Sequence, residues 1–293
     1  MSEKQLGKLT VREFFARFPD EETCLDHIME VRYGMEHFCR ACGLRSTFHK
    51  LANRRAFSCA HCGDHVYPTA GTVFQDTRTP LHVWFYAIYL FVTTRHGVSG
   101  KELERTLGVT YKTAWRMGHQ IRLLMAKAEG WEKLKGHVEM DEAYVGGYEP
   151  GAKGGVGKTV VLGMHERGGR TIAGVVPDAK MRTIRPIVNR NVERGSIVST
   201  DEHRSYGLLS GDGYRHGAVE HGAYEWARYD ARAHATHHTN NVENFWKIFK
   251  NSIRSTHISI SPKYMDRYLK EFTFRANHRA MQNAMFDLLI GAV

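Results

Sequence analysis

Four cysteines in the first quarter of the chain stand in two closely spaced pairs. Cys39 and Cys42 form the first pair, Cys59 and Cys62 form the second, and 16 residues lie between the pairs. Zn²⁺ takes four soft ligands in a tetrahedron, and each Cys-x2-Cys turn places two sulfurs on one ion. The spacing predicts a zinc ribbon over about residues 37–66, with four metal-free thiols as the alternative. Two nearby histidines could replace a cysteine ligand: His61 and His65.

Three carboxylates in the second half of the chain could hold catalytic cations. Asp141 and Asp201 each come at the end of an expected strand, and Glu243 lies in a segment with an apolar helical stripe. Mg²⁺ prefers carboxylate oxygens, and grouped carboxylates repel one another unless cations neutralise them. Two such ions about 4 Å apart would support phosphodiester cleavage or transfer. Taken singly, each acid could instead be a turn residue, a helix cap or a solvated side chain.

Lys250 follows Glu243 by seven residues. Two helical turns separate them, so we expect both side chains on one face of the same helix.

The segments around these acids predict an α/β domain with a mixed sheet. Short β-rich runs occur at residues 137–147, 159–169 and 170–178, followed by a helical stretch at 181–195 and another β-rich run at 196–206. Chemistry in open α/β sheets gathers at the carboxyl ends of strands, where we expect Asp141 and Asp201 to lie.

A helix-turn-helix pattern precedes this region, between about residues 98 and 125. Ser99 begins a capping box, Gly108 ends the first helix, and Thr110 caps the second. The start of the second helix of such a motif enters the DNA major groove. An ordinary helical hairpin with a solvated polar face is the alternative. The expected DNA-facing residues are Tyr111, Lys112, Thr113 and Arg116.

The composition favours a polyanionic partner. The chain has 41 Lys and Arg against 31 Asp and Glu, a formal net charge of +10.

The longest apolar run of the chain, residues 81–92, is shorter than the roughly 20 residues of a membrane span. We expect it to form a buried helix with Thr79 as its cap and Pro80 in its first turn. Since no signal peptide is seen, we expect a cytoplasmic protein without a membrane partner, and Cys24 as a core residue.

Three further patterns are set aside. Gly157-Lys158-Thr159 resembles part of a nucleotide-binding loop, but Ala152 occupies the position of the required earlier glycine, and residues 148–155 are predicted to form a flexible loop. No Gly-x-Ser-x-Gly phrase indicates a serine hydrolase. The remaining pattern is a group of histidines that we expect to approach phosphate or solvent: His234, His237 and His238.

The order and wording of the motifs resemble the prokaryotic insertion-sequence transposases of the DDE class that begin with a zinc ribbon, the ISXO-type group. The matching phrases are the ribbon cysteines, MDEAYVGG around Asp141, STDEHRSY around Asp201, HTNNVENFWKIFK around Glu243 and SPKYMDRYLKEFTFRANHR near the end. The resemblance implies that Asp141 and Asp201 are metal ligands, that Glu243 is the third acid, with Asn240 as the alternative, and that Lys250 is the basic residue after it. It implies an RNase H-like catalytic domain that uses two Mg²⁺ ions, or Mn²⁺ in their place.

The implied function is cleavage at the terminal inverted repeats of an insertion sequence and joining of the 3′ ends to target DNA. The implied partners are double-stranded DNA and further copies of the chain, at least as a dimer, at the nucleoid of a prokaryotic cell. Lys250 would contact a phosphate near the scissile bond, with Arg254 beside it. An RNase H-like nuclease without strand transfer and a non-enzymatic DNA-binding regulator are the competing functions. The expected domains are an N-terminal helical segment (1–36), the zinc ribbon (37–78), the helix-turn-helix region (79–130) and the RNase H-like domain (136–293).

Overall fold

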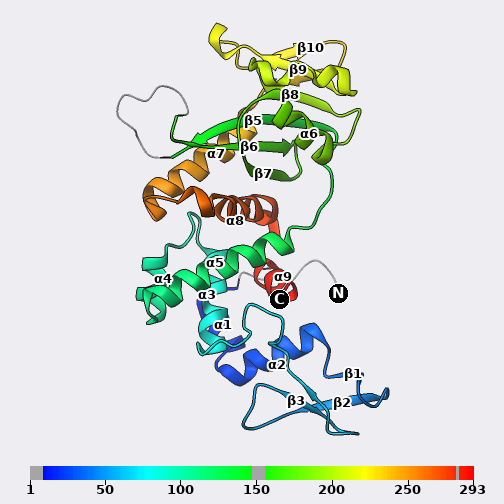
Figure 1. Cartoon of the computed structure of the whole chain (residues 1–293), viewed down its shortest axis with the longest axis vertical. Helices are drawn as coiled ribbons and strands as arrows, with labels where there is room; N and C mark the ends of the chain where they lie inside the picture. The colour runs from blue at the N-terminus through cyan, green and yellow to red at the C-terminus, as the bar shows by residue number, and fades with distance from the viewer. Residues whose placement is uncertain (1–8, 147–155, 282–283) are drawn as a thin grey trace. The chain divides into compact units, whose positions relative to one another are not determined.

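The computed structural model describes residues 9–146, 156–281 and 284–293, which form two compact units (Figure 1). The first unit comprises Met1–Ala128 and Met281–Val293, and the second comprises Glu129–Ala280. The loop predicted at residues 148–155 lies outside the described residues. Within the described ranges, every helix is too short or too polar to cross a membrane.

The first unit contains helices and a small antiparallel sheet. The sheet has the strand order β1-β2-β3-β4, with each strand antiparallel to its neighbour. It corresponds to the predicted ribbon. The elements are α1 (Val11–Arg17), α2 (Glu21–Arg32), β1 (Glu36–Phe38), β2 (Arg45–Lys50), β3 (Phe57–Cys59), β4 (His65–Val66), α3 (Leu81–Thr93), α4 (Gly100–Leu107), α5 (Tyr111–Ala128) and α9 (Ala284–Gly291).

An aromatic core holds the helices of this unit together. The ring of Phe286 on α9 lies 5.8 Å from Phe14, 5.4 Å from Phe18 and 5.8 Å from Phe85, measured between ring centres. The apolar side chains of α9 can leave water only against such a partner, and the aromatic rings of α1 and α3 supply it. Residues 281–293 therefore join the first unit, whereas the sequence analysis assigned them to the catalytic domain.

The predicted apolar helix is α3, and Trp84 and Phe85 on it are fully buried. Its start differs from the prediction. Pro80 is the N-cap residue, with a non-helical ψ of 145°, and its neighbour Leu81 begins the helix. The backbone N–H of Leu81 donates to the Glu21 carboxylate, which takes the capping role predicted for Thr79. Cys24 is buried in this unit, as predicted.

Helices α4 and α5 have the predicted boundaries. The Ser99 hydroxyl accepts a hydrogen bond from the backbone of Glu102 (3.1 Å), and the Thr110 hydroxyl accepts one from Thr113 (3.3 Å). Gly108 ends α4 in the left-handed region at a φ of 65°, which a residue with a Cβ rarely adopts.

The second unit is built on a five-stranded mixed sheet of order β7-β6-β5-β8-β9. Strand β6 runs antiparallel to both of its neighbours, β5 and β7, and β8 and β9 are parallel to β5. This is the α/β fold with a mixed sheet that the sequence predicts. The elements are β5 (His137–Val145), β6 (Thr159–Glu166), β7 (Thr171–Val176), α6 (Met181–Asn191), β8 (Ile197–Asp201), β9 (Arg215–Val219), β10 (Arg228–Asp230), β11 (Ala235–His237), α7 (Asn240–Ser252) and α8 (Met265–His278).

Short helical turns connect these elements. They are Arg204–Tyr206, Leu209–Asp212, His221–Ala223, Pro262–Tyr264 and Arg279–Met281, which are 3-10 helices, and Ile253–His257, which is a π-helix.

Separate cores form on the two faces of the large sheet. On one face, Ile184 and Val188 of α6 pack with Val138 and Met140 of β5. On the other face, α7 and α8 pack against the remaining side chains of β5 and against β6 and β7. Because side chains alternate along a strand, odd-numbered residues of β5 face α7 and even-numbered residues face α6.

Candidate functional site

Asp141 and Asp201 lie on adjacent parallel strands. Asp201 is the last residue of β8. The ladder between β5 and β8 ends at the pair Glu139–Ser199, and Asp141 and Asp201 each lie two residues beyond that pair. Val145 of β5 packs in the core beneath α7, so Asp141, which has the same parity, projects from the same face. The prediction that Asp141 lies at the end of its strand is wrong, because pairing with β6 extends β5 to Val145.

Glu243 comes to this face on the first turn of α7. Val242 and Trp246 on the buried side of α7 pack against the sheet, which leaves the Glu243 side chain 43% exposed beside it. Lys250 is in the last turn of the same helix and is half-buried. The predicted helix over Glu243 and Lys250 is therefore present.

The charges of these residues act on one another. Burial is the main cause that raises the pKa of Asp141 to about 8, and the carboxylates of Asp201, Glu142 and Glu243 raise it further. The Lys250 ammonium acts in the opposite direction. The strand pairing of β5 with β8 and the place of Glu243 on the first turn of α7 put these acids on the same face of the sheet. Half-buried carboxylates that repel one another favour a bound cation.

A glycine allows α7 to approach the sheet at this point. Gly163 of β6 is paired with Asp141 of β5. A Cβ atom at Gly163 would lie 2.5 Å from Cζ2 of Trp246 and 3.0 Å from Cγ2 of Val242, closer than packed atoms allow. Gly163 therefore sets the distance between α7 and the strand that carries Asp141.

Glu139, which the sequence analysis did not identify as a site residue, joins β5 to the start of α7. Its side chain is fully buried. Oε2 accepts hydrogen bonds from the backbone N–H groups of Asn241 (2.8 Å) and Val242 (3.3 Å), and Oε1 accepts one from Nδ2 of Asn241 (2.8 Å). The N-cap residue, Thr239, makes no side-chain cap, so Glu139 satisfies N–H groups that the helix leaves open and places negative charge at its positive end.

Arg167 and His238 complete the surroundings of this carboxylate. Nε of Arg167 donates to Oε1 of Glu139 at 2.7 Å, and Nδ1 of His238 lies 3.1 Å from the same oxygen. Arg167 also donates to the backbone oxygens of Thr236 (2.7 Å) and His238 (3.2 Å). Removing one partner of a buried ion pair typically costs about 3 to 5 kcal/mol. The sequence did contain one signal for the role of Glu139. It lies two residues before Asp141, and alternate residues of a strand point to the same face of the sheet.

Glu243 has two neighbours that the sequence analysis also missed. The Thr239 hydroxyl donates to Oε1 of Glu243, and Nε2 of His221 lies 3.3 Å from the same oxygen. His221 belongs to a short turn between β9 and β10, remote in sequence from α7. Asn240, the alternative third ligand, is the exposed first residue of α7.

The expectation that His237 and His238 approach phosphate or solvent is wrong. His237 is fully buried, and His238 is held against Glu139. The Ser199 hydroxyl lies 2.8 Å from Nδ1 of His237 and 2.7 Å from Nε2 of His137. Asp230 lies 3.7 Å from Nε2 of His237, but Ser199 is fully buried and cannot meet a substrate as a nucleophile. This group anchors β11 to the sheet.

The four predicted zinc ligands come together in the first unit. The ligand atoms of Cys39, Cys42, Cys59 and Cys62 all lie within 4.8 Å of one another, and the sulfurs of Cys39 and Cys62 are 3.6 Å apart. A tetrahedral ion with Zn–S bonds of 2.3 Å would hold its sulfurs about 3.8 Å apart. The cysteines therefore fit one structural Zn²⁺ ion.

The acids are spaced differently. Among the described residues, only the four cysteines form a group of three or more such ligands within 4.8 Å. Asp141, Asp201 and Glu243 thus do not converge on a single point. Two ions about 3.5 to 4 Å apart, each bound by part of the set, are compatible with wider spacing.

The predicted DNA-contacting residues of α5 lie in its first two turns. Tyr111, Lys112 and Arg116 are exposed, and Thr113 is half-buried. The Arg116 guanidinium lies 5.6 Å from the centre of the Trp84 ring. Arg254, in the second unit, is exposed in the π-helix that follows α7.

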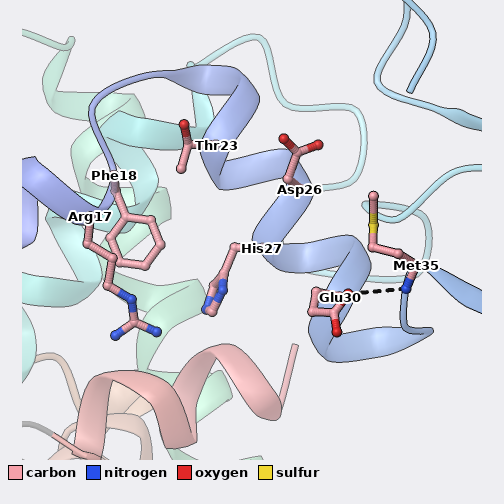
Figure 2. Close-up of a pocket in the computed structure, with 7 residues that line it drawn as sticks. All are labelled: Arg17, Phe18, Thr23, Asp26, His27, Glu30 and Met35. Carbon is pink, nitrogen blue, oxygen red and sulfur yellow. Dashed lines mark hydrogen bonds between the residues drawn. The ribbon is translucent and has the colours of Figure 1, made fainter. Parts of the chain in front are cut away.

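A surface pocket of about 360 Å³ lies in the first unit and contains none of the predicted site residues. Figure 2 shows its lining side chains on α1, α2 and the segment that follows, with Glu30 accepting a hydrogen bond from the backbone of Met35 at 3.1 Å. The rings of Phe18 and His27 are 5.2 Å apart in this pocket, and burial is the main cause that lowers the pKa of His27. The two carboxylates that line this pocket already have partners, since Lys50 donates to Asp26 at 2.8 Å and the backbone of Met35 donates to Glu30.

Comparison with known proteins links both units to mobile DNA elements. Residues 133–277 match the family model of the ISXO2-like transposase domain, and residues 19–65 match that of the transposase zinc-ribbon domain. A Halobacterium salinarum protein named as an uncharacterized protein in transposable element ISH50 is 26% identical over 284 residues, which cover 88% of this chain and 91% of that protein. A Haemophilus influenzae protein named as an uncharacterized transposase-like protein is 28% identical over 109 residues, 37% of this chain and 82% of that protein.

The cysteine cluster generates a prediction about metal content. The purified full chain should contain about one zinc ion per protomer, and Cys59→Ser should lose it, because a hydroxyl does not replace a thiolate on Zn²⁺. Cys24→Ala is the matched control and should retain zinc, since Cys24 is buried outside the cluster. Elemental analysis of reduced protein measures both. Full zinc content in Cys59→Ser would contradict the assignment.

Gly163 generates a prediction about stability. Gly163→Ala should lower the free energy of unfolding by about 1 to 3 kcal/mol, because the new methyl group forces α7 away from β6. Gly174→Ala on β7 is the control and should change it by less than about 1 kcal/mol, since the nearest atom to a Cβ there, Oδ1 of Asp266, is 3.8 Å away. Urea unfolding followed by circular dichroism compares them, and equal effects of the two substitutions would contradict the close approach.

Proposed function

This chain belongs to the ISXO2-like transposases that carry an N-terminal zinc ribbon, and from that premise we propose that it cuts and joins DNA. In this proposal it binds the terminal inverted repeats of an insertion sequence, cleaves phosphodiester bonds at the element ends and joins the 3′ ends to target DNA. The observation that carries the proposal is the gathering of Asp141, Asp201 and Glu243 on the face of the sheet covered by α7.

We further propose that the second unit is an RNase H-like catalytic domain. Three antiparallel strands are followed by a helix and then by strands parallel to the first, which supports this assignment. Asp141 on the first strand and Asp201 on the fourth strand of the unit lie side by side only because this connection makes β8 the parallel neighbour of β5.

Asp141, Asp201 and Glu243 would hold two Mg²⁺ ions, or Mn²⁺ in their place. When bound, such ions activate the attacking oxygen and stabilise the leaving oxygen of an in-line displacement at phosphorus. The Lys250 ammonium acts on the charge of Asp141 and would contact a phosphate near the scissile bond. Arg254, which follows Lys250 in the sequence, would join it.

Glu139 and Arg167 act in this proposal by positioning. The first turn of α7 donates to the Glu139 carboxylate, which is two residues from Asp141 on the same strand face. The first turn of α7, which carries Glu243, is therefore kept at a fixed distance from β5. Catalysis needs such groups within a fraction of an ångström of their productive positions, and a buried carboxylate with fixed donors supplies that restraint.

Binding of the element ends is assigned to the first unit. The ribbon and the helix pair α4–α5, acting as a helix-turn-helix, would hold duplex DNA, with Tyr111, Lys112, Thr113 and Arg116 at the major groove. Their exposure supports this assignment for Tyr111, Lys112 and Arg116. Because an element has two ends, we propose that at least two copies of the chain act together on DNA, at the nucleoid of a prokaryotic cell.

The test is a reaction between the purified full chain, a labelled duplex carrying the inverted repeat that flanks the gene, Mg²⁺ and a plasmid target. We expect cleaved ends and plasmid joined to the labelled strand. Cleavage without joining would favour a nuclease, and binding without cleavage would favour a regulator.

Substitution of one acid should separate binding from chemistry. Asp201→Asn should bind the labelled end with unchanged affinity but fail to cut it, because an amide lacks the charge that two divalent cations need. Asp266→Asn, an exposed acid on α8, is the matched control and should cut normally. Gel-shift and cleavage assays on the same preparations measure both steps. Normal cutting by Asp201→Asn would exclude the proposed cation site.

The third ligand can be identified by its metal requirement. Glu243→Gln should abolish cutting and joining at every practical Mg²⁺ concentration, whereas Asn240→Ala should retain activity with at most a raised Mg²⁺ requirement. The reason is that a carboxylate contributes charge that a neutral amide oxygen does not. Product yield measured against Mg²⁺ concentration compares the variants. An active Glu243→Gln beside an inactive Asn240→Ala would reverse the assignment.

A further inference from the structure

An exposed aromatic and basic surface is formed by the segment before and within the β10–β11 hairpin. Its aromatic members are Tyr224, Trp226 and Tyr229, whose exposed fractions are 83%, 60% and 64%. Arg228, which alternation turns to the other side of the strand from Tyr229, and Arg232 are exposed in the same segment. We refer to these five residues as the hairpin surface.

The aromatic side chains of this surface remain largely exposed to water. Aromatic side chains normally bury most of their area, and neighbouring exposed ones indicate a contact with another molecule. Across the part of the chain that the structure describes, Arg228 and Arg232 form no ion pair. Strand alternation keeps Tyr229 outward, since its neighbours Arg228 and Asp230 are paired with the inward residues His237 and Ala235.

The hairpin surface is connected to the acids through one histidine. The ring centres of Trp226 and His221 are 5.1 Å apart, and Nε2 of His221 lies 3.3 Å from Oε1 of Glu243. The hairpin is also fixed to the Glu139–Arg167 pair at the start of α7, because Arg167 donates to the backbone oxygen of Thr236 at 2.7 Å. A molecule bound over the Trp226 ring would therefore be separated from Glu243 only by the His221 ring.

We propose that the hairpin surface binds unpaired nucleotides of a single DNA strand beside the acids. This inference rests on the proposed function, and it specifies that the substrate at the site is a locally opened end. Bases in a duplex present their faces only to one another, whereas unpaired bases can stack on aromatic side chains. The arginines complement the phosphates of the same strand. Because every base has a stacking face, little sequence preference is expected.

The binding test uses the full chain and a fluorescein-labelled single-stranded oligothymidine, compared with a duplex of equal length. Trp226→Ala and Tyr229→Ala should each weaken single-strand binding roughly 5- to 150-fold, the loss of one stacked base at about 1 to 3 kcal/mol and 1.4 kcal/mol per tenfold. Trp226→Phe should retain most of the affinity. Trp131→Ala is the matched control, because Trp131 is 65% exposed in the same unit but lies beside Arg190 of α6. Circular dichroism confirms that each variant is folded.

The outcomes separate this inference from the proposed function. Unchanged single-strand affinity in both Trp226→Ala and Tyr229→Ala overturns the inference, whether or not the wild-type chain cuts element ends. Equal losses for single strand and duplex overturn it in favour of a duplex contact. Loss of self-association in a sedimentation experiment, with unchanged single-strand affinity, overturns it in favour of a second copy of the chain. Selective loss of single-strand binding supports it even if wild-type cleavage fails, a failure that would count against the proposed function alone.

Discussion

A buried carboxylate, Glu139, connects the strand that carries Asp141 to the helix that carries Glu243. It accepts hydrogen bonds from the first turn of α7 and is paired with Arg167, which in turn binds the backbone of the segment leading into α7. An isolated buried charge is unfavourable, so the Glu139 carboxylate depends on these donors as partners. The sheet, α7 and the β10–β11 hairpin are therefore held in position relative to one another by Glu139 and its donors.

The local patterns in the sequence were sufficient to predict most of the elements and the cysteine cluster. Ser99, Gly108 and the four cysteines act through neighbours close in sequence, and their geometry follows from spacing. The predicted mixed sheet is also confirmed. That prediction rested on local signals too, namely the alternation of apolar residues and the positions of turn residues. The roles assigned to Asp141, Asp201, Glu243, Asn240 and Lys250 remain proposals.

The contacts that the sequence did not reveal are those between remote segments. Glu139 meets Asn241, and Glu243 meets His221, at separations that no periodic pattern encodes. Gly163 is informative only once Trp246 is known to lie against it. The histidines near α7 were misjudged because their sequence surroundings look irregular and polar, whereas the fold buries His237 against Ser199.

The position of α9 has a consequence for synthesis of the protein. Phe14, Phe18 and Phe85 leave the ribosome early, but the ring that packs on all three, Phe286, is made only after the whole second unit. During translation the first unit thus exposes an incomplete aromatic core while the second unit can already fold, since domains generally fold as units as they emerge. A nascent chain that stops before α9 would carry all the acids of the second unit together with an unfinished first unit. The aromatic core of the first unit is thus completed only after the second unit has been synthesised.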